Sequence, residues 1–360
     1  MQALTSAPTV PAAQWRRMTL VSSGSALIVA RALGPDGAKV VVKVATEEKA
    51  ANELRRDASA RQCLAADGRL GGWSALLPEV LVAELGTLPA VAVERQRGCC
   101  DGRSVLAGPL PVAAVALRNA LEAVAELHGR TGGPSVVGEA LVRQWVREPL
   151  ALVASLYQAG SWQARSLAHL EASLADVLIG RRVFTGWSHG DYAPGNLLFA
   201  GEGGGTLGGV VDWGAASPTG LLGRDTAILV ITTVMLRHRL DLGGVIIRLL
   251  GLAPQIPDWQ GQGGGQGRWL ALERLALEWD RQAAWSRAAS GPAGGCTVPL
   301  PASVGDGDQE APGPVTTLWL AWVQHVARNI AKAEMYSRRR AWRIANIDVV
   351  LTLVRSAPMS

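Results

Sequence analysis

The chain has 360 residues, of which 48% are hydrophobic and 18% charged, and its formal net charge at pH 7 is +5. This composition excludes a disordered chain, and the length is sufficient for two domains with a buried core. The small excess of 35 basic over 30 acidic residues forms no basic stripe interleaved with aromatic residues, so no nucleic-acid partner is expected.

The cysteines and the apolar segments bear on the cellular setting. The four cysteines show no metal-ligand spacing, and Cys99 and Cys100 are adjacent, so we expect neither a disulfide framework nor a zinc site. The first fifteen residues lack the basic and apolar segments of a secretory signal. The longest apolar run, residues 227–236, is about half the length that crosses a bilayer. The sequence therefore indicates a cytoplasmic protein without membrane association.

The first 96 residues predict a small antiparallel sheet with one helix packed on it. Five short runs rich in β-branched residues indicate strands at residues 19–21, 26–32, 40–44, 80–85 and 90–94. The turn sequence Gly-Pro-Asp-Gly at residues 34–37 predicts a hairpin between the second and third strands. Thr46, followed by acidic residues, is expected to be the N-cap of a helix that ends at about Ala66.

The remainder of the chain predicts a mostly helical domain. Apolar residues spaced three to four apart indicate helices at residues 112–128, 141–157 and 164–179, from residue 226 onward, and within 315–355. Short strands are expected at residues 196–199 and 208–211. Gly-rich and Pro-rich stretches at residues 260–267 and 290–314 indicate loops. The expected architecture is an α+β chain of two lobes, with residues 1–96 forming a sheet-containing lobe and residues 97–360 a larger helical lobe.

One polar segment carries most of the chemical information. In residues 188–196, Ser-His-Gly-Asp-Tyr-Ala-Pro-Gly-Asn, a carboxylate at Asp191 is followed five residues later by the carboxamide of Asn196. A second carboxylate, Asp212, follows an apolar strand and precedes Trp213. This pattern suits phosphoryl transfer, because Asp191 can accept the proton of an attacking hydroxyl while Asn196 and Asp212 offer oxygen ligands to Mg²⁺. A chance Asp in a surface turn would not explain the whole pattern.

The pattern H-G-D-x-x-x-x-N followed by Asp-Trp-Gly resembles the signature of the aminoglycoside phosphotransferase family, within the wider choline kinase and protein-kinase-like fold. The residues that match it are His189, Gly190, Asp191, Asn196, Asp212 and Trp213. The resemblance implies a bilobal protein-kinase-like fold with ATP and Mg²⁺ as cofactors. It also implies that Asp191 is the catalytic base, that Asn196 and Asp212 are metal ligands, and that His189 supports the loop structurally.

Lys43 stands in an otherwise apolar strand, where an unpaired ammonium group would be costly to bury. The resemblance implies that Lys43 binds the nucleotide phosphates and pairs with an acid on the following helix. Asp57 occupies the position where the family usually carries Glu, and it is one methylene shorter. Glu53, one turn earlier on the same helical face, is the alternative partner. In the absence of the downstream motif, an edge-strand lysine that points to water would be the simpler interpretation.

Two further segments correspond to nucleotide-binding regions by resemblance. The turn at residues 22–25 lies where the family has its nucleotide-covering loop, so Ser23, Gly24 and Ser25 are expected to reach the phosphates through N–H and hydroxyl groups. The strand end at residues 93–98 resembles the hinge between the lobes, where the backbone around Glu94 and Gln96 would bind the adenine edge. The Glu94 side chain itself is equally well explained as a solvated charge.

The phosphate acceptor is less constrained by the sequence. From Ala215 onward the chain has 15 basic and 11 acidic residues, which favours a neutral or mildly charged hydroxyl compound over a polycation. Glu273, Glu278 and Asp280 offer carboxylates for an acidic pocket nevertheless. We expect an ATP- and Mg²⁺-dependent kinase that transfers the γ-phosphate to a small-molecule hydroxyl, such as a sugar, an amino alcohol or a natural product. The alternatives are an aminoglycoside-inactivating kinase and a non-catalytic ATP-binding module, and the sequence does not indicate an oligomeric state.

Overall fold

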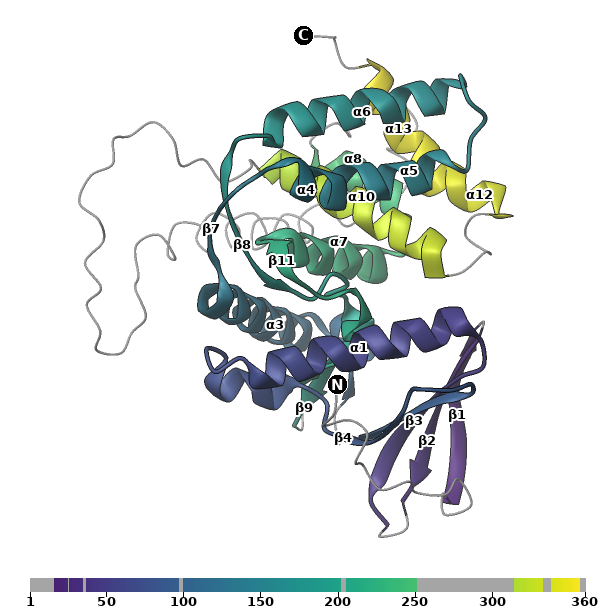
Figure 1. The fold of residues 1–360 in the computed structure, drawn as a ribbon, viewed down its shortest axis with the longest axis vertical. Helices are drawn as coiled ribbons and strands as arrows, with labels where there is room; N and C mark the ends of the chain where they lie inside the picture. The colour runs from purple at the N-terminus through teal and green to yellow at the C-terminus, as the bar shows by residue number, and fades with distance from the viewer. Residues whose placement is uncertain are drawn as a thin grey trace, which may run out of the picture. The chain divides into compact units, whose positions relative to one another are not determined.

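The computed structural model describes residues 16–24, 26–34, 37–96, 100–201, 205–250, 314–332 and 338–356. The helices and strands are labelled in Figure 1. Contacts between residues divide the chain into two compact units. The first comprises Met1–Arg130 and His189–Ser217, and the second comprises Thr131–Ser188 and Pro218–Ser360. This grouping places residues 100–130 and the whole H-G-D-x-x-x-x-N segment with the N-terminal sheet. It therefore does not follow the division at residue 96, which stays a prediction about functional lobes.

The N-terminal sheet of the first unit has five antiparallel strands, as the sequence predicted. They are β1 (Arg16–Gly24), β2 (Leu27–Leu33), β3 (Lys39–Ala45), β4 (Val80–Glu84) and β5 (Ala90–Arg95). Their order is β1-β2-β3-β5-β4, and the predicted hairpin between β2 and β3 is confirmed by the pairing of Leu33 with Lys39. In β3 and β5, Lys43 lies opposite Ala92 and Val41 lies opposite Glu94. Because side chains alternate along a strand, Lys43 and Glu94 are on the same face of the sheet.

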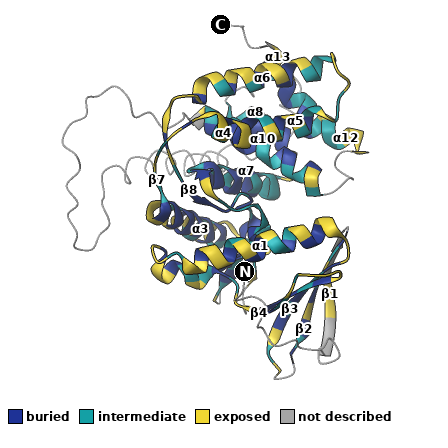
Figure 2. Ribbon diagram, viewed as in Figure 1, coloured by how far each residue is buried: buried dark blue, intermediate teal, exposed yellow. Residues whose placement is uncertain are grey.

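Helix α1 (Glu48–Ala66) packs on this sheet through small side chains. Its buried residues Ala50, Ala51 and Leu54 form one apolar cluster with Ala45 of β3 and Ala90 of β5. The helix begins one residue later than predicted, since Glu47 is the N-cap and makes no side-chain cap hydrogen bond. The expectation that Thr46 is the N-cap is wrong, because its hydroxyl donates to the carbonyl oxygen of Ala26 instead (3.2 Å). Figure 2 shows the alternation of buried and exposed positions along α1.

The first unit also contains a second, three-stranded sheet and a long helix. The sheet has the order β10-β9-β6, formed by β10 (Thr206–Val210), β9 (Leu197–Ala200) and β6 (Cys100–Asp101). Strands β9 and β10 confirm the two short strands predicted there. Helix α2 (Gly102–Ala107) follows β6, and α3 (Leu110–Thr131) accepts hydrogen bonds from Trp73 and Tyr192 at the carbonyls of Ala123 and Ala120. Helix α3 thus anchors the segment that contains Asp191.

The second unit is largely helical, around a three-stranded sheet of order β11-β8-β7. The strands are β7 (Gly133–Val136), β8 (Arg182–Ser188) and β11 (Ser217–Leu221), and none of them was predicted. The longer helices are α6 (Trp162–Leu178), α7 (Arg224–His238), α8 (Leu242–Leu249), α10 (Pro314–Lys332) and α13 (Val349–Ser356). The helix α12 (Arg340–Arg343) and the π-turn Ile344–Asp348 lead into α13. No helix within the described ranges is long and apolar enough to cross a membrane.

The helix predicted at residues 141–157 is interrupted by a π-helical turn. Helix α4 (Glu139–Val142) passes into the π-turn Arg143–Arg147 and then into α5 (Glu148–Ala154). Pro149 has no backbone N–H, and its ring collides with the carbonyl four residues earlier in a regular α-helix. That carbonyl belongs to Trp145, and it accepts a hydrogen bond from the side chain of Gln324 instead (3.2 Å). Pro149 therefore explains why the structure interrupts the helix that the hydrophobic pattern predicts as continuous over residues 141–157.

Candidate active site

His189 connects the H-G-D segment to the strand that precedes Asp212. The backbone N–H of Asp191 donates to its Nδ1 (3.2 Å), so the proton of the neutral ring is on Nε2, which donates to the carbonyl oxygen of Val211 (2.9 Å). The ring is fully buried and lies 4.5 Å from the Trp213 ring, centroid to centroid. With both ring nitrogens committed to backbone groups, His189 suits the supporting role that the resemblance implies.

Asp191, Asn196 and Asp212 are brought together by short backbone and side-chain contacts. The Asn196 side chain donates through Nδ2 to the carbonyl oxygen of Asp191 (2.7 Å), so Oδ1 is its accepting atom. The backbone carbonyl of Asn196 accepts from Val211 (2.9 Å), the residue before Asp212. Asp212 has φ 64° and ψ 62°, a left-handed conformation that most non-glycine residues avoid and that Asp and Asn tolerate best. Backbone strain of this kind is concentrated at functional sites.

The donor set of Asn196 and Asp212 fits a magnesium ion. Mg²⁺ is usually bound by one or two carboxylates, with nucleotide phosphates and water completing its shell. Across the described ranges, no group of three or more His, Cys, Asp or Glu side chains could hold a metal ion. The assignment of both residues as metal ligands stays a prediction.

Gly190 sets the distance between the H-G-D segment and the loop after Asp212. It has φ +77°, and a Cβ at this position would overlap the backbone carbonyl oxygen of Ala215. Gly195 is different, because a Cβ there would meet the guanidinium end of Arg103 (2.6 Å from Nε), a side chain that can move away. Substitution by alanine is therefore expected to destabilise the protein at Gly190 and to have little effect at Gly195.

We expect Gly190→Ala to lower the free energy of unfolding by about 2 kcal/mol or more, because a left-handed alanine costs about 1–2 kcal/mol and the overlap with Ala215 adds to it. Gly195→Ala is the matched control, with an expected change within about 0.5 kcal/mol. Urea unfolding of the two purified variants measures both values. Equal losses in the two variants would show that the contact between Gly190 and Ala215 does not constrain the loop.

Lys43 belongs to a buried cluster of four charged side chains. Its Nζ lies 2.8 Å from Oε1 of Glu94 and 4.0 Å from Oδ2 of Asp57. Arg61 contacts both acids, at 2.5 Å from Asp57 and 3.1 Å from Glu94. Side-chain exposure is 14% for Lys43 and 5% for each of the others, so the interpretation of Glu94 as a solvated charge is wrong. The cluster contains two cations and two anions and is neutral as a whole.

The two predicted partners of Lys43, Asp57 and Glu53, differ in whether they contact it. Asp57 is within ion-pair distance of Lys43, although Glu94 is closer, and no hydrogen bond or ion pair joins Lys43 to Glu53. Burial lowers the pKa of Lys43, but the attraction to Glu94 and Asp57 outweighs burial and the repulsion from Arg61, and the pKa is raised above its ordinary value of 10.5. Lys43 is therefore a cation throughout the neutral and mildly alkaline range.

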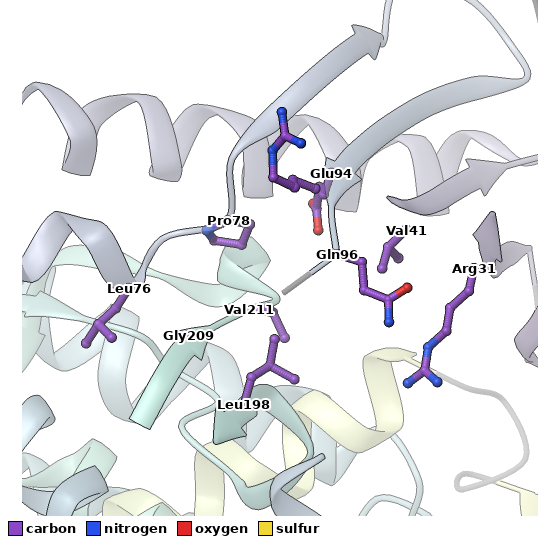
Figure 3. A pocket seen from close by; sticks show the side chains of 10 residues that line it. Arg31, Val41, Leu76, Pro78, Glu94, Gln96, Leu198, Gly209 and Val211 are labelled. Atoms are coloured by element: carbon purple, nitrogen blue, oxygen red, sulfur yellow. The ribbon is translucent and has the colours of Figure 1, made fainter. Parts of the chain in front are cut away.

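A pocket lies beside this cluster within the first unit (Figure 3). Its apolar lining includes Val41 of β3, Leu198 of β9 and Val211 after β10, and its polar lining includes Glu94, Gln96 and Arg31. Figure 3 shows the Gln96 side chain between Val41 and Arg31, with Leu198 and Val211 facing it. The lining thus combines apolar side chains with charged and amide groups, which can fix the orientation of a small ligand.

The structure places the remaining predicted nucleotide-binding residues in different settings. Ser23 and Gly24 are in β1, paired with Ile28 and Leu27 of β2, rather than in a turn. Ser25 is outside the described residues. The backbone N–H of Gln96 already donates to the carbonyl oxygen of Lys39 (2.9 Å), so this group is not a free donor for an adenine edge. The roles of Ser23, Gly24, Ser25, Glu94 and Gln96 toward a nucleotide stay predictions.

Sequence reasoning missed Arg61 and the tie between Asp57 and Trp213. The backbone N–H of Trp213 donates to Oδ1 of Asp57 (2.6 Å), across 156 residues of sequence. Arg61 lies one helical turn after Asp57, and this i,i+4 spacing of opposite charges was available as a signal. No local pattern indicates the contact with Trp213.

Fold and site together define a small-molecule phosphotransferase with a protein-kinase-like architecture. The chain belongs to the phosphotransferase enzyme family, whose model matches residues 19–241 and so includes every predicted site residue. Both the resemblance stated from the motif and the enzyme class are thereby confirmed.

Comparison with solved structures shows the same fold at low sequence identity. The chain is similar to macrolide 2'-phosphotransferase type I, with 14% identity over 92% of this chain and 90% of that chain and a TM-score of 0.52. It is also similar to macrolide 2'-phosphotransferase MphH from Brachybacterium faecium (15% identity, 95% and 93% coverage, TM-score 0.46) and to a glucosamine kinase (16%, 95% and 92%, TM-score 0.41). A comparison with curated proteins found no match.

Proposed function

We propose that the protein is an ATP- and Mg²⁺-dependent kinase that transfers the γ-phosphate to a hydroxyl group of a small molecule. One observation carries this proposal: a single compact unit contains the buried Lys43 cluster, the Asp191 loop and the left-handed Asp212. Hydrogen bonds from His189 to Val211 and from Trp213 to Asp57 connect these three parts. Family membership supports the reaction class.

Each residue has a role that its chemistry allows. Lys43, held as a cation, binds the nucleotide phosphates, and the apolar side chains of Val41, Leu198 and Val211 in the pocket pack against the base. Asn196 and Asp212 hold Mg²⁺, which neutralises phosphate charge when it is bound. Asp191, only 7% exposed, binds the acceptor hydroxyl, orients its oxygen toward the phosphate and receives its proton.

The proposed acceptor is a neutral or mildly charged hydroxyl compound, such as a sugar, an amino alcohol or a natural product. Its support is the basic charge balance after Ala215, with 15 basic and 11 acidic residues, since a polycation is favoured by carboxylates. The three carboxylates considered for an acidic pocket, Glu273, Glu278 and Asp280, lie outside the described residues. The proposal therefore depends on overall charge rather than on the geometry of an acceptor pocket.

We expect nucleotide consumption to rise when Mg·ATP and the protein meet a neutral hydroxylated acceptor, and to rise less with a polycationic aminoglycoside. The measurement is ADP release over a panel of sugars, amino alcohols, macrolides and aminoglycosides, with mass spectrometry of the products. Asp191→Asn serves as the inactive control. Preferential phosphorylation of aminoglycosides would overturn the acceptor class, and the absence of any phosphorylated product would overturn the transfer reaction.

A further inference from the structure

We infer that Glu94, at the end of β5, is the residue that positions Lys43, and that Asp57 instead anchors the loop after Asp212. The resemblance assigns the partner of Lys43 to the helix that follows it, whereas in this structure the shorter contact comes from an acid of the sheet. The inference rests on the proposed function, because positioning Lys43 has a purpose only where phosphates bind.

Strand register explains why Glu94 reaches Lys43. Glu94 pairs with Val41, two residues before Lys43 on the adjacent strand, so the two side chains are diagonal neighbours on one face of the sheet. The resulting contact, 2.8 Å between Nζ and Oε1, is both an ion pair and a hydrogen bond. Charge-assisted hydrogen bonds of this length are the strong ones, whereas 4.0 Å to Asp57 is the limit of an ion pair.

Asp57 has both carboxylate oxygens committed to other groups. Oδ1 accepts from the backbone N–H of Trp213 (2.6 Å), and Oδ2 accepts from Arg61 (2.5 Å). The shorter side chain of Asp keeps the carboxylate close to α1, where Arg61 of the next turn and the backbone of Trp213 meet it. Asp57 thereby joins α1 to the residue that directly follows Asp212.

The electrostatic balance around Lys43 gives this division a measurable consequence. The charged groups that act on Lys43 are Glu94 from β5, and Asp57 and Arg61 from α1. Its directly paired neighbours, Val29 of β2 and Ala92 of β5, are apolar, and Arg31 of β2, opposite Val41, is a further cation on this face of the sheet. Burial and Arg61 both oppose the charge on Lys43, while Glu94 is its strongest support. Neutralising Glu94 leaves the burial and the repulsion in place, so the Lys43 ammonium would lose its proton at a lower pH.

The experiment compares Glu94→Gln with Asp57→Asn, since each removes one negative charge from the same cluster and only the position differs. The readout is the dissociation constant for Mg·ATP as a function of pH, measured by calorimetry without acceptor. For the parent protein we expect a constant affinity up to about pH 10, because the pKa of Lys43 is raised above 10.5. In Glu94→Gln we expect affinity to fall at a pH about 1–3 units lower, the usual effect of removing an opposite charge at this distance.

Asp57→Asn should move the fall in affinity to lower pH by less than Glu94→Gln does, because Asp57 is the more distant acid and the weaker support of the charge on Lys43. It should also lower the midpoint of thermal unfolding, because a charged anchor between α1 and Trp213 is lost. Glu94→Asp retains the charge at a longer distance, so its pH shift should be smaller than that of Glu94→Gln. This variant also serves if Glu94→Gln does not fold. A merely structural role for Glu94 would weaken affinity equally at every pH.

The outcomes separate this inference from the proposed function. A parent protein that binds no Mg·ATP would overturn the proposed function, and this inference with it. If the parent binds Mg·ATP and the alkaline fall in affinity shifts at least as far in Asp57→Asn as in Glu94→Gln, the inference alone is overturned. That result would show that Asp57 of α1 positions Lys43.

Discussion

Asp191→Asn is expected to reduce phosphorylation of the acceptor by roughly 10²–10⁴-fold, the usual contribution of a positioned acid–base group. The substitution keeps the size of the side chain and one accepting oxygen but removes the charge that orients the hydroxyl and receives its proton. Phosphoryl transfer has a loose transition state, so most of the loss should come from orientation rather than basicity. Acceptor turnover at saturating Mg·ATP measures the effect.

The same variant should bind Mg·ATP almost as the parent does, because Asn196, Asp212 and Lys43 are unchanged. The contacts that hold the loop also survive: the N–H of residue 191 still donates to His189, and its carbonyl still accepts from Asn196. Nucleotide affinity and acceptor turnover are therefore measured on one preparation. Loss of nucleotide binding would make Asp191 a metal-binding or structural residue, and unchanged turnover would remove it from the mechanism.

The sequence predicted the parts of the fold that have local signals. Alternating β-branched residues located all five strands of the N-terminal sheet, and the Gly-Pro-Asp-Gly turn located its hairpin. Strands β7, β8 and β11 were missed. Strands β7 and β11 are short and contain Gly and Pro, which weaken a strand signal, whereas β8, with Val, Phe, Thr and Trp, carries a signal that the prediction overlooked. The interruption before Pro149 was missed because the prediction followed hydrophobic spacing alone, although a proline within a helical pattern is itself a signal of a kink.

The site was predictable where its residues belong to one motif and not where they meet through topology. Asp191, Asn196 and Asp212 were selected by residue type, spacing and resemblance to one motif, and the structure places them on one pair of connected loops. Glu94 is 51 residues from Lys43, and the two meet only because β5 is inserted beside β3 in the sheet. Strand order of this kind depends on tertiary packing, which no local pattern encodes.

Asp212→Asn is expected to lower Mg·ATP-dependent turnover by about 10²–10³-fold, the range for loss of one preorganised charge-stabilising group. The structure favours Asn over Ala for this test. Asp212 has φ 64°, and Asn tolerates the left-handed region far better than Ala does. Asp212→Asn therefore removes the charge with little backbone strain, whereas Asp212→Ala adds a strain cost of about 1–2 kcal/mol.

Comparing the two variants separates metal binding from loop structure. If Asp212 acts through its charge, both variants lose turnover to a similar extent, while only Asp212→Ala loses stability in urea unfolding. Raising the Mg²⁺ concentration should then restore part of the activity of Asp212→Asn, because a weaker site fills at higher metal concentration. Full turnover in Asp212→Asn at ordinary Mg²⁺ would reject Asp212 as a metal ligand and leave its left-handed backbone as its contribution to the site.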